Sequence, residues 1–545
     1  MPKPLLDRAH KALADQNPAL AERIARQATE RFPKASAAWR TLGLILQEAG
    51  RTLEAFEAYE RALGLNPNDV DIALALSHAA SRLGMKDEAL ALASYFAQAR
   101  PGDMAGISAQ CTALLALSRV QEAHDLAVQA LGDAPQEAER WQLAGKTARA
   151  SGGLEQAAQA LQEALRLKPN DPRIHYDLAW TLADMGDLEP ALNGVEQALA
   201  QPLDAETRAT AAFLRATILL AKGDLKAGWS AYRVRHDLDL PSAAVFDLEL
   251  PRWDGQSDLA GHALVVMAEQ GLGDEIAFMG MIPDLLERLG PTGQLTLCAD
   301  QRLKGLIERS WPTVKAVGHQ TQAQLARRHR SPSAPVEGEM WLPLGDLLPL
   351  LRSTIADFDR PAGFLTPDAT QVAHWHAWLE TLPNGTKTGV TWRSHKMGDE
   401  RGRNFAPLSA WGPIFTEPGL TFVNLQYGDT ADECAEIAAQ FGVTVHQPPD
   451  LDLFNDLEGL AALSAALDMG IGFSNASTNL LGAVGTPLHL LTPPASWPTL
   501  GQSTYPWYPG TQVHEAQTYG DWDGLMVKAA KRIGAFKLTK RSRTY

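Results

Sequence analysis

Five prolines recur at intervals of 34 residues in the first third of the chain: Pro33, Pro67, Pro101, Pro135 and Pro169. A fixed interval of about 20–50 residues indicates a stack of similar helical units, because each unit buries its apolar face only against its neighbours. The series stops near residue 170 of 545. We therefore expect an arm of repeats followed by a different fold.

Residues 36–69 show what each unit contains. Gly43 and Ala55 are small residues expected where two helices approach closely, and Pro67 ends the second helix. This unit closely resembles the tetratricopeptide consensus at eight positions: Trp39, Leu42, Gly43, Leu46, Ala55, Tyr59, Ala62 and Pro67. Comparable units, some degenerate, predict six to seven helix pairs in a solenoid over residues 1–237.

The first helices of such units line a concave face. Six large, uncharged side chains fall at these inner positions and are candidates for binding an acceptor protein: Leu44, Leu74, Leu115, Leu143, Tyr176 and Trp180. An apolar groove suits a partner that offers an apolar helical face. Alternatively, several of these residues pack between neighbouring units. Catalysis is not expected on this face.

Composition excludes some functions. The net charge of −15 argues against nucleic acid as a partner, because phosphate backbones are bound by positive surfaces. The three cysteines are far apart, so we expect reduced thiols. The N-terminus lacks the apolar run of a signal peptide, and no stretch approaches the ~20 apolar residues of a membrane span. We expect a cytoplasmic protein.

From residue 251, short apolar runs alternate with helical stretches, which is typical of parallel α/β sheets. Residues 262–268 and 294–299 predict strands of one half, and residues 319–339 predict a turn-rich loop. Strands of a second half are predicted at residues 388–392, 420–425, 468–473 and 487–491. The expected fold class is α + α/β, with domains at 1–237, 238–385, 386–523 and a terminal helix and basic tail at 524–545.

The order of three motifs in residues 262–510 carries a family resemblance. A Gly-Leu-Gly-Asp turn at Gly271–Asp274 opens the first half, Trp392-Arg-Ser opens the second, and Ser474–Thr478 begins a late helix. This layout resembles GT-B glycosyltransferases of the heptosyltransferase and O-GlcNAc-transferase families. With a tetratricopeptide arm in front, it most resembles bacterial flagellin glycosyltransferases. The resemblance implies two Rossmann-like domains and transfer of a nonulosonic acid to Ser or Thr of flagellin.

The resemblance assigns the catalytic base to Asp274, at the matching position on the first turn. Glu275 and Glu269 lie beside it, so three carboxylates compete for this role. Asp274 could instead only cap the helix that follows. Gly271 and Gly273 of the same turn are candidate donor-binding residues.

A cradle for the departing phosphate is expected where a helix begins, because its free N–H groups and dipole favour an anion. The candidates are Ser474, Asn475, Ala476, Ser477 and Thr478, and Asn479 is a further donor-binding candidate. Ordinary helix capping explains the same residues. Many relatives have Asp-Asn-Ala-Thr-Ala-His here, so this chain lacks an acid and a histidine, which indicates a different donor sugar or impaired catalysis.

Arg393 follows a strand end, where its guanidinium could neutralise the leaving phosphate. Lys396, Arg401 and Arg403 belong to the same loop. Gln426, Tyr427 and Gly428 follow the next strand and are candidates for holding the base or ribose. We expect no metal, because Asp-x-Asp pairs are scattered and His395, His374 and His376 have no partners at metal spacing.

The sequence therefore predicts an inverting, metal-independent glycosyltransferase without a cofactor, which uses a nucleotide sugar, CMP-linked, and binds flagellin through its arm. One alternative is a UDP- or ADP-sugar enzyme acting on another protein. A second is a tetratricopeptide adaptor whose transferase half has lost activity.

Overall fold

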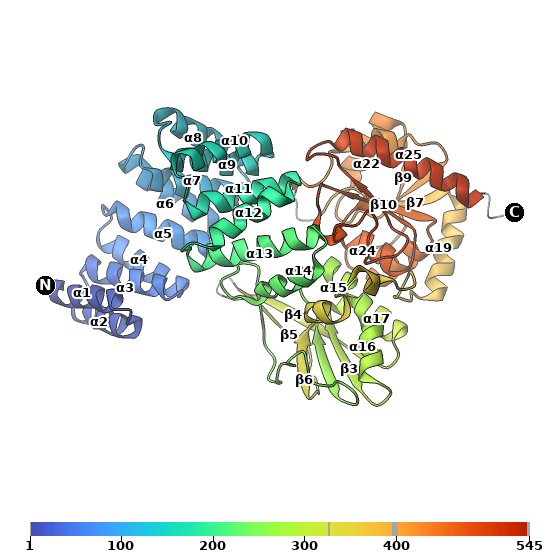
Figure 1. Cartoon of the computed structure of the whole chain (residues 1–545), viewed down its shortest axis with the longest axis horizontal. Helices are drawn as coiled ribbons and strands as arrows, with labels where there is room; N and C mark the ends of the chain where they lie inside the picture. Colours follow the sequence, from blue (N-terminus) through green and yellow to red (C-terminus); the bar gives the residue numbers. More distant parts are fainter. Residues whose placement is uncertain (1, 325–326, 395–401, 542–545) are drawn as a thin grey trace. The chain divides into compact units, whose positions relative to one another are not determined.

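The computed structural model describes residues 2–324, 327–394 and 402–541. Its first part consists of seven consecutive helix pairs, which confirms the predicted solenoid (Figure 1). The helices α1 to α14 span, in order, Lys3–Ala14, Pro18–Arg31, Ser36–Glu48, Thr52–Leu65, Val70–Arg82, Lys86–Ala99, Met104–Ala116, Val120–Asp133, Ala138–Ala150, Leu154–Leu167, Pro172–Met185, Leu188–Leu199, Ala205–Ala221 and Leu225–Tyr232.

The recurring prolines stand just beyond the second helix of each pair. Pro33 follows the end of α2 at Arg31, and its carbonyl accepts the indole N–H of Trp39 at 2.9 Å. Pro135 follows α8 and accepts from Trp141 at 2.7 Å. The proline ends one helix, and its carbonyl binds a side chain of the next pair. The period of 34 residues thus has a direct structural cause.

The small residues of the repeat allow close helix packing, as predicted. A Cβ placed on Gly43 would lie 2.7 Å from the ring of Tyr59, whose side chain is only 2% exposed. A Cβ on Gly145 would meet Leu161 at 2.6 Å. Only glycine leaves room at these positions for a large side chain of the paired helix.

The chain divides into two compact units, which part within α11 between Asp177 and Leu178. The last helix pair therefore belongs to the second unit with the α/β part. Trp229 and Tyr232 of α14 share a buried core with Ile276, and the Trp229 indole donates to the Arg352 carbonyl at 2.8 Å. Helical structure extends to His236, close to the predicted boundary at residue 237.

The second unit contains two six-stranded sheets (Figure 1). The first has the order β1-β5-β4-β3-β2-β6. Its strands span Ala244–Phe246, Ala263–Met267, Gln294–Ala299, Val314–Gln324, Arg327–Pro332 and Met340–Pro343 for β1 to β6. The predicted loop at residues 319–339 was wrong, because β4 and β5 occupy much of it. β5 pairs in parallel with β1, about 80 residues earlier, which local turn residues cannot reveal.

The second sheet has the order β12-β11-β10-β7-β8-β9, and its neighbouring strands are all parallel. Its strands span Thr386–Thr391, Leu420–Asn424, Val445–His446, Met469–Phe473, Leu488–Thr492 and Gln512–Glu515 for β7 to β12. Counted along the chain, this is the doubly wound order 3-2-1-4-5-6. Such sheets bind ligands beyond the carboxyl ends of the strands where the order reverses, here β7 and β10.

Helices surround both sheets, with α16 and α17 beside the first and α22, α24 and α25 around the second (Figure 1). The helices named below span Leu272–Phe278 (α15), Ile282–Leu289 (α16), Lys304–Ser310 (α17), Ala369–Thr381 (α19), Ala431–Phe441 (α22), Leu457–Ala466 (α23), Ala476–Ala483 (α24) and Trp522–Arg541 (α25). The terminal helix α25 extends through most of the segment predicted as a terminal helix and basic tail, residues 524–545. A solenoid followed by two α/β lobes confirms the predicted fold class.

Candidate functional site

A cleft of about 830 Å³ lies where residues following the strands of both sheets come together. From the first lobe it is lined by residues 270–275, which follow β2 and include the first turn of α15. From the second lobe it is lined by Ser394 after β7 and by residues 474–477 after β10. The predicted turn and the predicted helix start therefore belong to one cavity.

Asp274 lies in the first turn of α15 and lines this cleft, half-buried. Its carboxylate accepts the backbone N–H of Gly271 at 3.2 Å, so it does cap its own helix. The pKa of the Tyr232 phenol is raised, mainly by burial and secondly by the negative charge of Asp274. The phenols of Tyr505 and Tyr508 also have raised pKa values, chiefly through burial and in part through Asp274. The charge of Asp274 therefore acts on three buried phenols that stay protonated.

Glu275 has a different environment. Its side chain is only 2% exposed, and its carboxylate accepts from Arg330 Nη1 at 3.1 Å and from the Asp300 backbone N–H at 3.0 Å. His319 Nε2 lies 2.7 Å away. The guanidinium of Arg330 also donates to the carbonyls of Ala268 and Gln270. Glu275 therefore lines the cleft, but its carboxylate is almost fully buried among these partners and holds the turn together.

Glu269 is also held in the interior. It is 3% exposed, pairs with Arg235 through both carboxylate oxygens at 3.0 and 3.2 Å, and accepts the Gly345 N–H at 2.7 Å. The next residue, Gln270, has a φ of +64°, a left-handed conformation that is strained for a residue with a side chain. Of the three carboxylates, Glu269 does not line the cleft, Glu275 lines it but is buried, and Asp274 lines it with a half-buried side chain.

The helix start in the second lobe is stabilised by its own side chains. Asn475 accepts the Thr478 N–H at 3.0 Å, while its own N–H donates to Thr478 Oγ1 at 2.9 Å. Ser477 Oγ donates to the Leu425 carbonyl at 2.9 Å. These side chains are buried, whereas Ser474 is exposed. An anion here would meet the Ser474 hydroxyl and the first backbone N–H groups of α24.

Two helix starts, of α15 and α24, touch in the cleft because Gly273 has no side chain. A Cβ on Gly273 would lie 2.9 Å from Asn479 Nδ2 and 3.8 Å from the Ala476 nitrogen. Asn479 is fixed, since its amide donates to the Asn475 carbonyl at 2.7 Å and its oxygen accepts from the Tyr508 hydroxyl at 2.7 Å. The candidate base and the candidate phosphate cradle are therefore neighbours.

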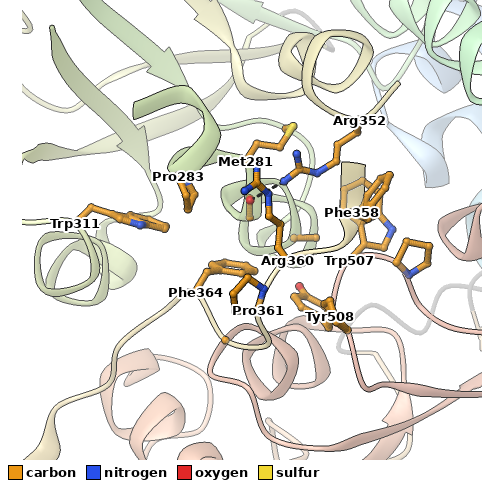
Figure 2. A pocket seen from close by; sticks show the side chains of 15 residues that line it. Met281, Pro283, Trp311, Arg352, Phe358, Arg360, Pro361, Phe364, Trp507 and Tyr508 are labelled. Carbon is orange, nitrogen blue, oxygen red and sulfur yellow. Dashed lines mark hydrogen bonds between the residues drawn. The ribbon is translucent and has the colours of Figure 1, made fainter. Parts of the chain in front are cut away.

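A second cavity of about 240 Å³ is lined by Ala277 of α15 and by Met281, Trp507 and Tyr508 among others. Figure 2 shows aromatic rings and two arginines around it. Trp311 and Phe364 stack at 6.4 Å between ring centroids, and Phe364 and Tyr508 at 6.1 Å. Tyr508 lines this cavity, and its hydroxyl donates to Asn479, which lines the cleft. The aromatic cluster therefore helps to hold Asn479 in place.

Arg393 is not among the residues that line the cleft. Its guanidinium binds both carboxylate oxygens of Glu433 on α22, each at 2.6 Å, and donates to the Asp429 carbonyl at 3.1 Å. Hydrogen bonding to Glu433 raises the pKa of Arg393. In this arrangement, Arg393 joins the end of β7 to the start of α22.

Gln426 is fully buried and plays a similar supporting part. Its side-chain oxygen accepts the N–H groups of Trp392 and Arg393 at 3.0 and 2.9 Å. Tyr427 lines the cleft, and Gly428 has a φ of +90°, which favours glycine. Of the three predicted contacts to base or ribose, the cleft therefore includes Tyr427.

Four further residues of the segment after β7 were named in the sequence analysis: His395, Lys396, Arg401 and Arg403. His395, Lys396 and Arg401 lie outside the described residues. Arg403 forms an ion pair with Asp184 of α11 at 2.6 Å. Among the described side chains, no three His, Cys, Asp or Glu residues gather as a metal site would require.

The predicted acceptor-binding residues of the arm differ in burial. Leu143 is 8% exposed and belongs to a buried cluster with Cys111 and Leu114, against which Leu115 packs. For these two leucines, packing between units is the observed role. Four residues are half-buried on their helices: Leu44, Leu74, Tyr176 and Trp180.

Several cleft residues were missed by sequence reasoning. The first lobe contributes Arg302, Arg328 and Arg330, and the second contributes Phe454. The basic run 327–330 was the available signal, but it was assigned to a loop. Because β5 places alternate residues on opposite sides, Arg328 and Arg330 reach the cleft together.

Comparisons with known proteins identify the repeats of the arm and a relative over nearly the whole chain. Tetratricopeptide repeat family profiles match residues 6–70 and 41–103, and a second repeat profile matches residues 145–186. Protein FlbA of Caulobacter vibrioides is 39% identical over 536 residues, which cover 97% of this chain and 89% of that protein. The tetratricopeptide protein TTC0263 of Thermus thermophilus is 27% identical over 33% of this chain and 98% of its own, with a TM-score of 0.30.

A second solved structure, a tetratricopeptide repeat protein from Parabacteroides merdae, is 16% identical over 43% of this chain and 91% of its own, with a TM-score of 0.38. Among the described helices, none has the length and apolar character needed to cross a membrane.

Proposed function

Because the chain belongs to the family of protein FlbA, whose match extends through both the helical arm and the α/β lobes, we propose that arm and lobes act together as a protein O-glycosyltransferase. The α/β lobes transfer a sugar from a nucleotide donor to a Ser or Thr hydroxyl. The arm binds the acceptor protein, which the resemblance to flagellin glycosyltransferases identifies as flagellin. Tetratricopeptide stacks are suited to this part, because they present extended binding surfaces.

One observation carries the proposal. Asp274 and the start of α24 line the same cleft and meet at Gly273, whereas Glu269 and Glu275 are held by buried arginines. A transferase needs a base for the acceptor and a cradle for the leaving phosphate next to each other. This pair of groups satisfies both needs.

In the proposed reaction, the acceptor oxygen attacks the anomeric carbon from the face opposite the phosphate. A new carbon–oxygen bond forms as the bond to the phosphate oxygen breaks, and the electron pair leaves with the phosphate. Asp274 takes the hydroxyl proton. The α24 N–H groups and Ser474 stabilise the new phosphate charge.

The acidic sugar expected from the resemblance, a CMP-linked nonulosonic acid, has support from Arg328. This exposed residue of β5 lines the same cleft, and a guanidinium there suits a carboxylate. A UDP- or ADP-sugar donor acting on another protein is the alternative within the same reaction class. An inactive adaptor is the alternative outside it.

The test measures donor binding and sugar transfer with the full chain. Calorimetric titration with CMP, UDP, ADP and GDP identifies the donor class, and transfer to purified flagellin is followed by mass spectrometry. Asp274→Asn should abolish transfer while leaving nucleotide binding within about twofold, because the base acts on the acceptor. Asp432→Asn is the matched control, since Asp432 lies in the first turn of α22 and is exposed.

A nucleotide-binding wild-type protein whose transfer survives in Asp274→Asn would exclude Asp274 as the base. A wild-type protein that binds none of the four nucleotides and transfers nothing, but still binds flagellin, would favour the adaptor.

A further inference from the structure

Phe454 is an aromatic side chain at the cleft that the proposed reaction does not yet use. It follows β9 and precedes α23, lines the cavity with Leu453 and Leu457, and remains 43% exposed. Contact between a large apolar side chain and water is unfavourable, and a ligand that covers the side chain removes this cost. A nucleotide donor has one flat, weakly hydrated part, its base.

The backbone turn that carries Phe454 is ordered. Asp452 Oδ1 accepts the N–H groups of Phe454 and Asn455 at 2.9 and 3.0 Å, and Asn455 Nδ2 donates to Asp452 Oδ2 at 2.8 Å. These hydrogen bonds, led by that of the Asn455 side chain, lower the pKa of Asp452. The exposed ring is therefore displayed from a fixed turn.

Arg302 and Tyr427 complete the surroundings of the ring. The guanidinium carbon of Arg302 lies 5.4 Å from the Phe454 ring centroid, and its Nη1 donates to the Phe454 carbonyl at 2.7 Å. The Arg302 charge is balanced by Asp300 at 2.6 Å. The Tyr427 ring lies 6.0 Å from Phe454, inclined by 53°. An arginine and two aromatic rings thus meet in a single corner of the cleft.

We propose that this corner, centred on Phe454, binds the nucleobase of the donor by stacking. The proposal rests on the proposed function, and it moves the base from the predicted contacts at Gln426 and Gly428 to the loop before α23. Arginine guanidinium groups and aromatic rings both stack on bases, whichever base is present. Arg302 also joins the first lobe to the second through the Phe454 carbonyl, so base binding engages both lobes.

The test uses the full chain and the nucleotide that wild-type protein binds most tightly among CMP, UDP, ADP and GDP. Removal of a stacking ring weakens nucleotide binding by about 5- to 150-fold, so Phe454→Ala should raise the Kd by that factor. Phe454→Trp keeps an aromatic face and should restore binding to within about threefold. Inorganic pyrophosphate, which has no base, should bind Phe454→Ala and wild type equally.

Leu238→Ala is the matched control, because Leu238 is also a large exposed apolar residue, at 48%, and does not line the cleft. Its nucleotide Kd should not change. An unchanged nucleotide Kd in Phe454→Ala overturns the stacking site and leaves the proposed function standing. An equal loss of pyrophosphate binding also overturns it, because the effect would then not concern the base. A wild type that binds no nucleotide overturns the proposed function, and the stacking site with it.

Discussion

Arg235 and Glu269 form a buried ion pair that joins the last helical repeat to the turn carrying the candidate base. Arg235 lies directly after α14, and Glu269 lies just after β2. Two nitrogen–oxygen distances of 3.0 and 3.2 Å make the pair bidentate, and both side chains are at most 3% exposed. The pair fixes the backbone beside the strained Gln270. The last helical repeat, which belongs to the second unit, thus takes part in building the cleft.

Replacing Arg235 by Ala should strongly destabilise the second unit. Glu269 would remain buried without its cation, which typically costs about 3–5 kcal/mol. Arg252→Ala is the control, because Arg252 pairs with the same cluster at Asp346 but is 43% exposed and should lose less than about 1 kcal/mol. Urea unfolding followed by circular dichroism measures both. Equal midpoints for the two variants would contradict the structural role of the pair.

Gly273→Ala should damage the cleft specifically. The new methyl group would press on Asn479 Nδ2 at 2.9 Å, and hydrogen bonds to Asn475 and Tyr508 prevent that side chain from moving away. Overpacking of this kind costs about 1–3 kcal/mol, and it would separate α15 from the start of α24. We expect a loss of transfer that exceeds the loss of stability.

The control for this variant is Gly132→Ala, in α8, where a Cβ meets nothing within 4 Å. It should leave transfer unchanged and stabilise its helix by up to about 1 kcal/mol. If Gly273→Ala retains full transfer activity, the close contact of the two helix starts has no importance for the reaction.

Gly43→Ala should destabilise the arm. Its Cβ would lie 2.7 Å from two ring carbons of Tyr59, which is buried and whose hydroxyl donates to Gln47 at 3.0 Å. We expect a loss of about 1–3 kcal/mol in thermal or urea unfolding. Gly64→Ala, in α4 with open space around it, is expected to be neutral or stabilising. Tolerance of Ala at residue 43 would argue against the predicted packing reason for the repeat.

Acid should destabilise the second lobe through His489 and His514. These buried imidazoles lie on β11 and β12 with 2.9 Å between Nδ1 and Nε2, and burial lowers their pKa values to about 4 and about 3. The unfolded chain takes up these protons near pH 6.5, and the folded chain does not. Stability is therefore complete above about pH 6.5 and falls as the pH drops toward 4, by up to about 1.4 kcal/mol per pH unit for each histidine.

Unfolding midpoints measured from pH 7.5 to 4.5 test this dependence. His489→Gln and His514→Gln should each reduce the acid slope, since glutamine does not titrate. His376→Gln, on the exposed face of α19, should leave the slope unchanged. A wild-type slope that survives both buried replacements would assign the acid sensitivity to other groups.

The repeats and the strands of the α/β part could be predicted because their signals are local. In the repeats, the same features return at a fixed spacing along the chain. They are the length of each helix, the residue that ends it, such as Pro67, and the small residue where two helices touch, such as Gly43. The buried strands that became β2, β3, β7, β8, β10 and β11 are short apolar runs that need no distant information. Asp274, Ser474 and Tyr427, which the sequence offered as candidates, line one cleft, because residues after parallel strands gather at one edge of a sheet.

Tertiary structure alone decided what each polar group does. Sequence offered three carboxylates between residues 269 and 275, and only distant partners distinguish them: Arg235 for Glu269 and Arg330 for Glu275. In the same way, Arg393 pairs with Glu433 and does not line the cleft as a phosphate-binding residue would. The basic run at 327–330 forms a strand because it pairs with β1, and this strand contributes Arg328 and Arg330 to the cleft. Periodicity is a property of neighbours along the chain, whereas ion pairing, burial and strand pairing depend on residues brought together by folding.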